Sequence, residues 1–187
     1  MRMFNLDDTG TARQALQITS PNSDERPIGT VIDLVVIHNI SLPPGEFGGD
    51  GVVELFTNRL DPAEHPYYAE IHQFKVSSHF FVRRSGEVIQ FVPCGKRAWH
   101  AGVSQWQGRE RCNDFSIGIE LEGDDTTRFE DVQYATLEAL LTAIEQRYPI
   151  AGIVGHSDIA PGRKTDPGPF FDWTRINRSQ KDCRRTI

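Results

Sequence analysis

The sequence predicts a single α/β domain, because strongly apolar strands and one long amphipathic helix follow each other along the chain. Residues 31–37 are β-branched or aliphatic at nearly every position, which is typical of a strand buried on both faces. Residues 130–148 carry apolar side chains at helical spacing, and Pro149 ends that pattern. A second short apolar run at residues 150–154 predicts another buried strand. At 187 residues the chain is long enough for one domain with a substantial core.

Weaker signals place the remaining elements of this domain, which is expected to span residues 1–187. Residues 1–29 are rich in Asp, Asn, Ser, Pro and Gly, and are expected to form a loosely ordered or surface-wrapping arm. The other expected elements are a helix over 52–56 capped by Asp50, a short helix after Pro66, a hairpin of strands 77–82 and 87–92 turning at Gly86, a long loop at 93–114, a strand at 115–122 and a final helix near 172–178. The apolar stripe of the long helix is predicted to contain Val132, Ala135, Leu137, Leu140, Leu141 and Ile144.

Composition and charge exclude several classes of function. A net charge of −6 argues against general affinity for nucleic acid or for an anionic membrane surface, so we expect neither as a partner. A local basic pocket stays open, with Arg83, Arg84, Arg97, Arg109 and Arg111 as candidates. The three cysteines are widely spaced, and no apolar run has the length of a signal peptide or a membrane span. We therefore expect a cytoplasmic monomer with free thiols and no thiolate zinc site.

Two of the six histidines, His38 and His156, directly follow the predicted buried strands. In a mixed sheet such strand ends can converge, and catalytic zinc typically takes three protein ligands. The loop after His156 supplies two candidate carboxylates, Asp158 and Asp166, and its Pro and Gly residues predict a shaped loop rather than a helix or strand. Spacing does not choose between the two aspartates, although Asp158 also suits a turn. The alternative is a pair of separate, hydrogen-bonded histidines.

Glu120 and Lys164 are the further candidates for catalysis. In the strand 115–122, small residues (Ser116 and Gly118) precede Glu120 on one face, while the other face is apolar. This pattern leaves space over the glutamate, where a carboxylate can accept a proton from water activated by zinc; the alternative is an exposed glutamate on an edge strand. Lys164 carries the charge to stabilise an oxyanion, or is an ordinary solvated lysine.

Other histidine and cysteine combinations are weaker. Cys112 with His100 and Asp114 has the residue types of a cysteine nucleophile but none of its sequence signatures. His79 is expected to pack beneath the sheet. His65 and His72 lie in a polar segment and are expected to be exposed.

Five stretches together resemble one family. They are VIHNISLPPG (36–45), VSSHFFV (76–82), KRAWHAGVS (96–104), GRERCNDFSIGIELEG (108–123) and GHSDIAPGRKTDPGPFFDW (155–173). They resemble the AmpD-type 1,6-anhydro-N-acetylmuramyl-L-alanine amidases, which belong to the zinc amidases related to phage T7 lysozyme and to the peptidoglycan recognition proteins. The resemblance runs in order from about residue 4 to residue 175.

The resemblance implies a mixed central β-sheet flanked by α-helices, with residues 30–178 as the catalytic core. It implies that Zn²⁺ is held by His38, His156 and Asp166, and so favours Asp166 over Asp158. It also implies that Glu120 activates the attacking water. Lys164 is then the residue that stabilises the tetrahedral intermediate.

The implied substrate is an anhydro-muropeptide of cytoplasmic peptidoglycan recycling, cut between the lactyl group of anhydro-N-acetylmuramic acid and L-alanine. The implied substrate-contacting residues are Asn39, Trp99, Arg111, Ala160 and Lys75. Trp99 can pack against a sugar ring. Lys75 stands where relatives carry arginine, which weakens the expectation of a bidentate carboxylate contact there.

Two other functions are compatible with such a resemblance. The first is a muropeptide-binding sensor without catalysis, but such proteins typically lack a metal ligand and here all three are present. The second is an amidase acting on the intact cell wall, which would require export and is disfavoured by the N-terminal sequence.

Overall fold

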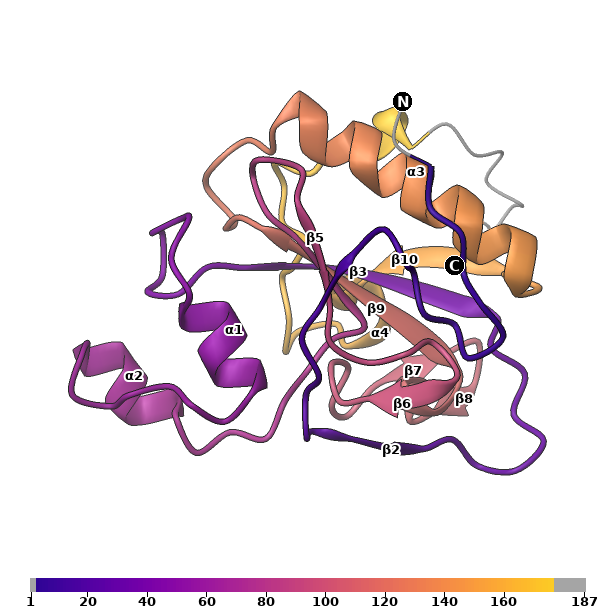
Figure 1. The fold of residues 1–187 in the computed structure, drawn as a ribbon, viewed down its shortest axis with the longest axis horizontal. Coiled ribbons are helices and arrows are strands. Elements are labelled where there is room, and N and C mark those ends of the chain that lie inside the picture. The colour runs from indigo at the N-terminus through magenta and orange to yellow at the C-terminus, as the bar shows by residue number, and fades with distance from the viewer. Residues whose placement is uncertain (1–2, 177–187) are drawn as a thin grey trace.

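A six-stranded mixed sheet forms the centre of the protein in the computed structural model, which describes residues 3–176 (Figure 1). Across the sheet the strands are β1 (Leu16–Gln17), β5 (Val88–Gln90), β4 (Phe80–Val82), β9 (Ser116–Glu122), β3 (Leu34–Ile40) and β10 (Gly152–Gly155). β4 and β5 are antiparallel, whereas the other neighbouring strands run parallel. The predicted fold class, a mixed sheet flanked by helices, is confirmed.

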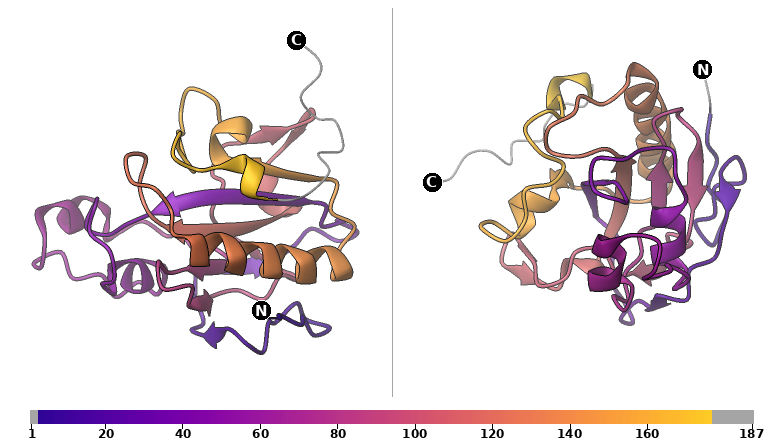
Figure 2. Two further views of the ribbon diagram at one scale, coloured as in Figure 1. Left: turned by 90° about the horizontal axis from the view of Figure 1, so that it is seen from above. Right: turned by 90° about the vertical axis from the view of Figure 1, so that its left-hand side faces the viewer.

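Helices and short strands cover the sheet. The helices are α1 (Gly51–Phe56), α2 (Pro66–Ile71), α3 (Asp131–Arg147) and α4 (His156–Ile159), with 3₁₀ turns η1 (Cys112–Asp114) and η2 (Trp173–Arg175). Two small antiparallel pairs join β2 (Ser23–Glu25) to β6 (Lys96–Ala98) and β7 (Gln105–Trp106) to β8 (Arg109–Glu110). Figure 1 shows α3 above the sheet, β2 and β6–β8 below it, and α1 and α2 at one end, and Figure 2 shows α3 running along the sheet.

The two faces of β3 pack into different parts of the core. Val35 and Ile37 belong to the apolar cluster that includes the buried side of α3. Leu34 and Val36 point the other way, into a cluster formed with the segment 101–115 and α4. Because side chains alternate along a strand, His38 must share the second face. The functional candidates therefore lie on the side of the sheet opposite α3.

The α3 helix is confirmed with a corrected buried stripe. It begins with a capping box between Glu130 and Gln133. Val132 is 45% exposed and Ala135 is also exposed, so both predictions for the stripe were wrong. Val132 lies next to Gly86 in the hairpin turn, at the margin of the sheet. Tyr134 is buried instead. The other four predicted stripe residues are buried: Leu137, Leu140, Leu141 and Ile144.

The N-terminal arm and the long loop are more ordered than predicted. Residues 3–29 contribute β1 to the central sheet and β2 to a small pair, so of the two alternatives for this arm, a loosely ordered or a surface-wrapping segment, the loosely ordered one is wrong. The expected loop 93–114 contains β6, β7, β8 and η1. Both errors have one cause: these strands are only two or three residues long and are specified by distant partners.

Three smaller predictions are also corrected. The loop after residue 155 begins with one turn of helix, α4, before the irregular segment. β10 is a half-buried edge strand rather than a fully buried one. The final helix is the 3₁₀ turn η2, and residues 177–178 of the expected helix and core lie outside the described residues. The expected α1, α2 and the β4–β5 hairpin are confirmed; Asp50 stands at the N-cap of α1, but its side chain makes no capping hydrogen bond.

Within residues 3–176, none of the helices has the length and apolar character needed to cross a membrane.

Candidate metal centre

Three neighbouring parallel strands carry the main candidate residues in one row. β3 pairs with β9 so that His38 lies opposite Glu120. β3 pairs on its other edge with β10, with Ile37 opposite Gly155, so His156 follows next to His38. Residues directly opposite on adjacent strands, on the same face, are within side-chain reach of each other. The sheet register alone thus gathers two histidines and one glutamate.

The loop after α4 adds Asp166 to the two histidines. His38 Nδ1 lies 3.0 Å from His156 Nδ1 and 2.9 Å from Asp166 Oδ2. His156 Nδ1 lies 3.0 Å from the same carboxylate oxygen. These three residues form a group whose ligand atoms are close enough to hold one metal ion. The structure therefore brings together the three predicted ligands, and Asp166 rather than Asp158 completes the set.

The hydrogen bonding of His156 shows that this group suits a cation. Its Nε2 lies 3.0 Å from the carbonyl oxygen of Ala101, which can only accept, so Nε2 carries the proton. In the neutral ring Nδ1 then presents a lone pair toward His38 and Asp166. Electron-rich atoms at such separations repel each other unless a proton or a metal cation lies between them.

The size and donor set are consistent with a transition metal such as zinc. A tetrahedral site with bonds of about 2.0 Å places its ligand atoms about 3.3 Å apart, a few tenths of an ångström more than the separations here. Two imidazoles and one carboxylate are typical zinc ligands, whereas calcium and magnesium prefer oxygen. Burial lowers the pKa of His38 to about 4, which keeps its imidazole neutral and able to bind a metal. Burial acts to raise the pKa of Asp166, but its contacts with His156 and His38 outweigh burial and hold that pKa below its ordinary value.

Glu120 is buried beside the metal group. Glu120 is only 7% exposed, and its Oε2 atom has no hydrogen-bond partner among the described residues. Burial, together with the negative charge of Asp166, raises the pKa of Glu120 well above its ordinary value, while Lys164 opposes the shift. A carboxyl group poised in this way can both take up and release a proton. The alternative of an exposed glutamate on an edge strand is wrong, because β9 is central.

The loop between α4 and Asp166 positions the remaining candidates differently. Asp158 Oδ2 accepts a 2.7 Å hydrogen bond from the Gly155 N–H, which makes Asp158 a structural residue of α4. Lys164 is exposed, and its charge acts on both His38 and Glu120. These influences place the Lys164 charge within electrostatic range of the metal group.

Comparison with known proteins identifies this arrangement. Residues 28–169 match the model of the N-acetylmuramoyl-L-alanine amidase family. The chain belongs to this amidase family. A relative from Escherichia coli strain K12, named 1,6-anhydro-N-acetylmuramyl-L-alanine amidase AmpD, is 58% identical over 164 residues, which are 87% of this chain and 90% of the relative.

Solved structures agree with this membership. A crystal structure of an AmpD derivative has a TM-score of 0.89 and 55% identity, and the match covers 94% of this amidase and 97% of that chain. A complex of the Escherichia coli amidase AmiD with anhydro-N-acetylmuramic acid-L-Ala-D-gamma-Glu-L-Lys has a TM-score of 0.57 and 31% identity, covering 92% of this amidase and 64% of that chain. The resemblance to AmpD-type amidases is confirmed.

The five residues expected to contact substrate have different settings in this amidase. Asn39 follows His38 on β3, and its amide donates to Asp125 Oδ1 (2.8 Å) and to the Pro167 carbonyl (3.0 Å), so it also holds the loop after Asp166. Two of the other four are at least partly buried: Trp99, just before His100, is half-buried, and Ala160, at the end of α4, is buried. Arg111, with a φ of 60°, and Lys75, between α2 and β4, are exposed.

His100 is the functional candidate that sequence reasoning missed. It was weighed only as a partner of Cys112, but Cys112 is fully buried and burial raises the pKa of its thiol, which opposes a nucleophilic role. His100 Nδ1 lies 3.0 Å from His38 Nε2 instead. The signal available in the sequence was the row of small residues on β9, which left space for a ring. His79 is buried as predicted, whereas His65 and His72 are half-buried rather than exposed.

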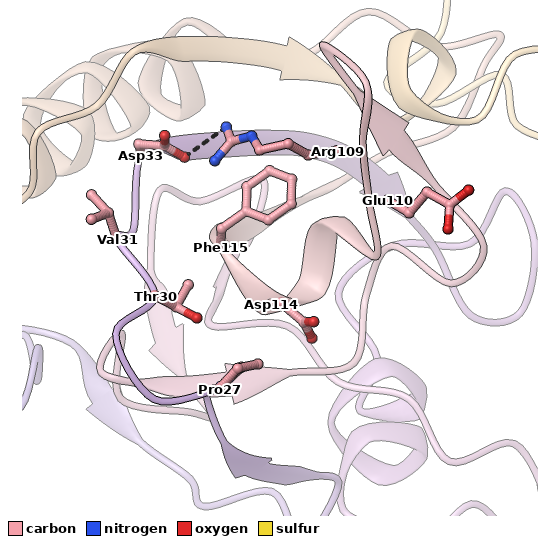
Figure 3. A pocket seen from close by; sticks show the side chains of 8 residues that line it. All are labelled: Pro27, Thr30, Val31, Asp33, Arg109, Glu110, Asp114 and Phe115. Carbon is pink, nitrogen blue, oxygen red and sulfur yellow. Dashed lines mark hydrogen bonds and ion pairs between the residues drawn. The ribbon is translucent and has the colours of Figure 1, made fainter.

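A cavity of about 590 Å³ lies at the opposite end of the β3–β9 pair (Figure 3). Its lining includes Asp33 and Phe115, which directly precede β3 and β9. Asp33 lies five residues before His38 and Phe115 five residues before Glu120, which is about 16 Å along an extended strand. Figure 3 shows Arg109 reaching Asp33 beside the ring of Phe115, and the guanidinium lies 4.0 Å from that ring's centre.

Each of the five arginines named as candidates for a local basic pocket pairs with a nearby carboxylate. The pairs are Arg83 with Asp50, Arg84 with Glu130, Arg97 with Asp24 and Asp114, Arg109 with Asp33, and Arg111 with Asp114.

Proposed function

We propose that this chain is a zinc-dependent amidase that hydrolyses the bond between the lactyl group of 1,6-anhydro-N-acetylmuramic acid and L-alanine in muropeptides. The observation that carries the proposal is the meeting of His38 Nδ1, His156 Nδ1 and Asp166 Oδ2 within about 3 Å of one another beside a buried glutamate. The names of the AmpD relatives and the anhydro-muropeptide bound to AmiD support the choice of substrate.

His38, His156 and Asp166 would hold the zinc ion. When bound, zinc supplies Lewis acidity, which polarises the amide carbonyl and makes a water molecule acidic near neutral pH. The outer nitrogens of the histidines already have acceptors, Ala101 O for His156 and His100 Nδ1 for His38. Such outer partners hold ligand rings in place and are typical of zinc sites.

Glu120 is proposed as the group that moves the proton. As a carboxylate it takes a proton from the attacking water, and as a carboxylic acid it returns that proton to the nitrogen of L-alanine as the amide breaks. Its burial supports this role, because a carboxyl group with a raised pKa holds the proton between the two steps. An ordinary exposed glutamate would release it to solvent.

Lys164 is proposed to stabilise the negative charge that develops on the carbonyl oxygen. A cation aimed at a developing oxyanion contributes most where water is largely excluded. Its influence on the pKa values of Glu120 and His38 supports a position facing the same space.

Substrate recognition is assigned to the residues that the family resemblance implies, namely Asn39, Trp99, Arg111, Ala160 and Lys75. The half-buried Trp99 has a ring suited to stacking on the sugar, and the exposed Arg111 and Lys75 suit carboxylates of the peptide stem. We also propose, from the resemblance to AmpD-type amidases, that the enzyme acts as a monomer in cytoplasmic peptidoglycan recycling.

The decisive experiment removes and restores the metal. Purified protein is treated with a chelator, zinc content is verified, and release of the L-alanyl peptide from an anhydro-muropeptide is followed by chromatography. We expect activity to disappear with the metal and to return with one equivalent of zinc. Unchanged activity after verified removal would contradict the zinc mechanism, and binding of the muropeptide without turnover by the zinc-loaded protein would identify a non-catalytic sensor instead.

A further inference from the structure

His100 lies between the metal group and β9 and contacts both. Its Nδ1 is 3.0 Å from His38 Nε2, and its Nε2 is 3.3 Å from the hydroxyl of Ser116. The two imidazole rings meet edge to face, with centres 5.0 Å apart. His100 is therefore linked to His38 on the side of the ring away from Asp166.

The proton positions along this chain follow from the acceptor at its far end. The Ser116 hydroxyl donates a 2.6 Å hydrogen bond to the Cys112 carbonyl, which can only accept. The Ser116 oxygen is then free to accept from His100, so His100 Nε2 carries a proton. In a neutral imidazole the other nitrogen is an acceptor. His100 Nδ1 must therefore accept from His38 Nε2–H, which leaves the lone pair of His38 Nδ1 directed at the metal group.

The sequence of β9 makes room for this ring. A Cβ atom at Gly118 would lie 2.4 Å from Cγ of His100 and 2.6 Å from its Nδ1, closer than any side chain can approach. Glycine at position 118 therefore leaves the room that the His100 ring needs against β9. The space predicted over this face of β9 is occupied by a histidine that reaches the metal group.

Ala101, the residue after His100, is the hydrogen-bond partner of the outer nitrogen of the second histidine, His156. The Ala101 carbonyl accepts from His156 Nε2, as described above. Asn113 Oδ1 holds this two-residue segment by accepting from the backbone N–H of both His100 (3.1 Å) and Ala101 (2.8 Å). One anchored dipeptide thus supports the outer nitrogen of each metal-binding imidazole.

We propose that His100 is a positioning residue, which fixes His38 in the tautomer that presents Nδ1 to the metal through the relay Ser116–His100–His38. The proposal rests on the zinc site of the proposed function. It adds a residue that touches neither the metal nor the substrate and acts only through a ligand. Outer partners of this kind typically change metal affinity by 10–100-fold.

The test compares two substitutions of the same size and shape. In His100→Asn the side-chain oxygen takes the place of Nδ1 and can still accept from His38, whereas His100→Leu places a methyl group there. We expect the zinc dissociation constant, measured by chelator competition, to rise 10–100-fold in His100→Leu and to stay within about threefold of the wild type in His100→Asn. His72→Leu is the matched control and should bind zinc as the wild type does, because the His72 ring lies next to α2 and contacts the backbone carbonyls of Tyr68 and Ala69.

Two results would overturn the proposal in folded variants: zinc affinity of His100→Leu within threefold of the wild type, or an equal loss in His100→Asn and His100→Leu. Circular dichroism establishes folding. A measurement on the wild type serves if His100→Leu does not fold: long-range ¹H–¹⁵N spectra of the zinc-loaded, histidine-labelled protein should show neutral His100 protonated at Nε2. Protonation of His100 at Nδ1 would refute the relay, whereas a wild-type protein that binds no zinc would refute the proposed function itself.

Discussion

Substitution of Glu120 by glutamine tests the proton-transfer role with little change in shape. Glutamine keeps the outline of the side chain but accepts no proton. Positioned acid–base groups contribute about 10²–10⁴-fold to rate, so we expect kcat to fall by that factor, or by about 3–5 kcal/mol of barrier. Zinc content and KM should stay near wild-type values, because Glu120 is not one of the three proposed ligands.

The same substitution should raise stability at neutral pH in the zinc-free protein. The ordinary pKa of a glutamate is 4.5, and burial raises the pKa of Glu120 well above that value in the folded state. Below pH 4.5 the side chain is protonated in both the folded and the unfolded state, so its ionisation does not affect stability. As pH rises from 4.5 to the folded pKa, the unfolded state loses the proton while the native state keeps it, so the native state is progressively destabilised. The free energy of unfolding of Glu120→Gln minus that of the wild type should therefore grow above pH 4.5 and level off at the folded pKa.

Glu122→Gln is the matched control, two residues along the same face of β9. Its carboxylate accepts hydrogen bonds from the backbone N–H groups of Gly48 (2.6 Å) and Arg84 (2.8 Å), so glutamine turns one acceptor into a donor. We expect it to lose about 1–3 kcal/mol of stability and to keep most of its turnover per folded molecule. Denaturant titrations and steady-state assays give both quantities. A Glu120→Gln enzyme that carries zinc and turns over within tenfold of the wild type would refute our assignment of proton transfer.

Three further substitutions test the neighbouring residues. Asp166→Ala should lose zinc affinity in chelator competition, whereas Asp158→Ala should keep it and lose only about 1 kcal/mol of stability; equal zinc loss in both would mean that the wrong aspartate was assigned. Lys164→Met should lower kcat by about 10²-fold with normal zinc content, and a change confined to KM would instead assign this lysine to substrate binding. Gly118→Ala should lower the thermal midpoint, through a loss of about 1–3 kcal/mol, and weaken zinc binding by displacing His100; unchanged zinc affinity would show that the ring can shift without consequence.

The convergence of His38 and His156 could be predicted from sequence because it depends on strong local signals. Each histidine follows a short apolar run that can form a strand, and adjacent parallel strands end at the same edge of a sheet. The sequence pattern could not predict that these two strands are neighbours in the sheet, because nothing in residues 31–37 indicates that they pair with residues 152–155.

The choice between Asp158 and Asp166 could not be predicted from sequence spacing for a related reason. Asp158 is nearer to His156 in sequence but uses its carboxylate on the Gly155 N–H at the start of α4. Asp166 reaches the histidines only because the intervening loop folds back, with the Ser157 N–H donating to the Asp166 carbonyl. A loop closed by its own backbone hydrogen bonds leaves little trace in residue types.

The N-terminal segment shows the limit of composition as a guide. Its polar character predicted loose order, yet Arg26 is half-buried and donates to the carbonyls of Cys94, Asn113 and Ser116. A buried guanidinium needs several acceptors, and here loop carbonyls from distant parts of the chain provide them. The segment is ordered by these long-range contacts, which no local pattern encodes.

β9 shows how one strand can encode a site that its neighbours complete. Its apolar residues pack against α3. Ser116, Gly118 and Glu120 alternate with them and lie on the opposite face, on the side of the metal group. Ser116 sets the proton on His100, Gly118 admits the His100 ring, and Glu120 stands opposite His38. The three small or acidic positions are therefore not independent. A larger residue at either of the first two would displace the ring that orients a zinc ligand, and the catalytic carboxylate would then act beside a disturbed metal site.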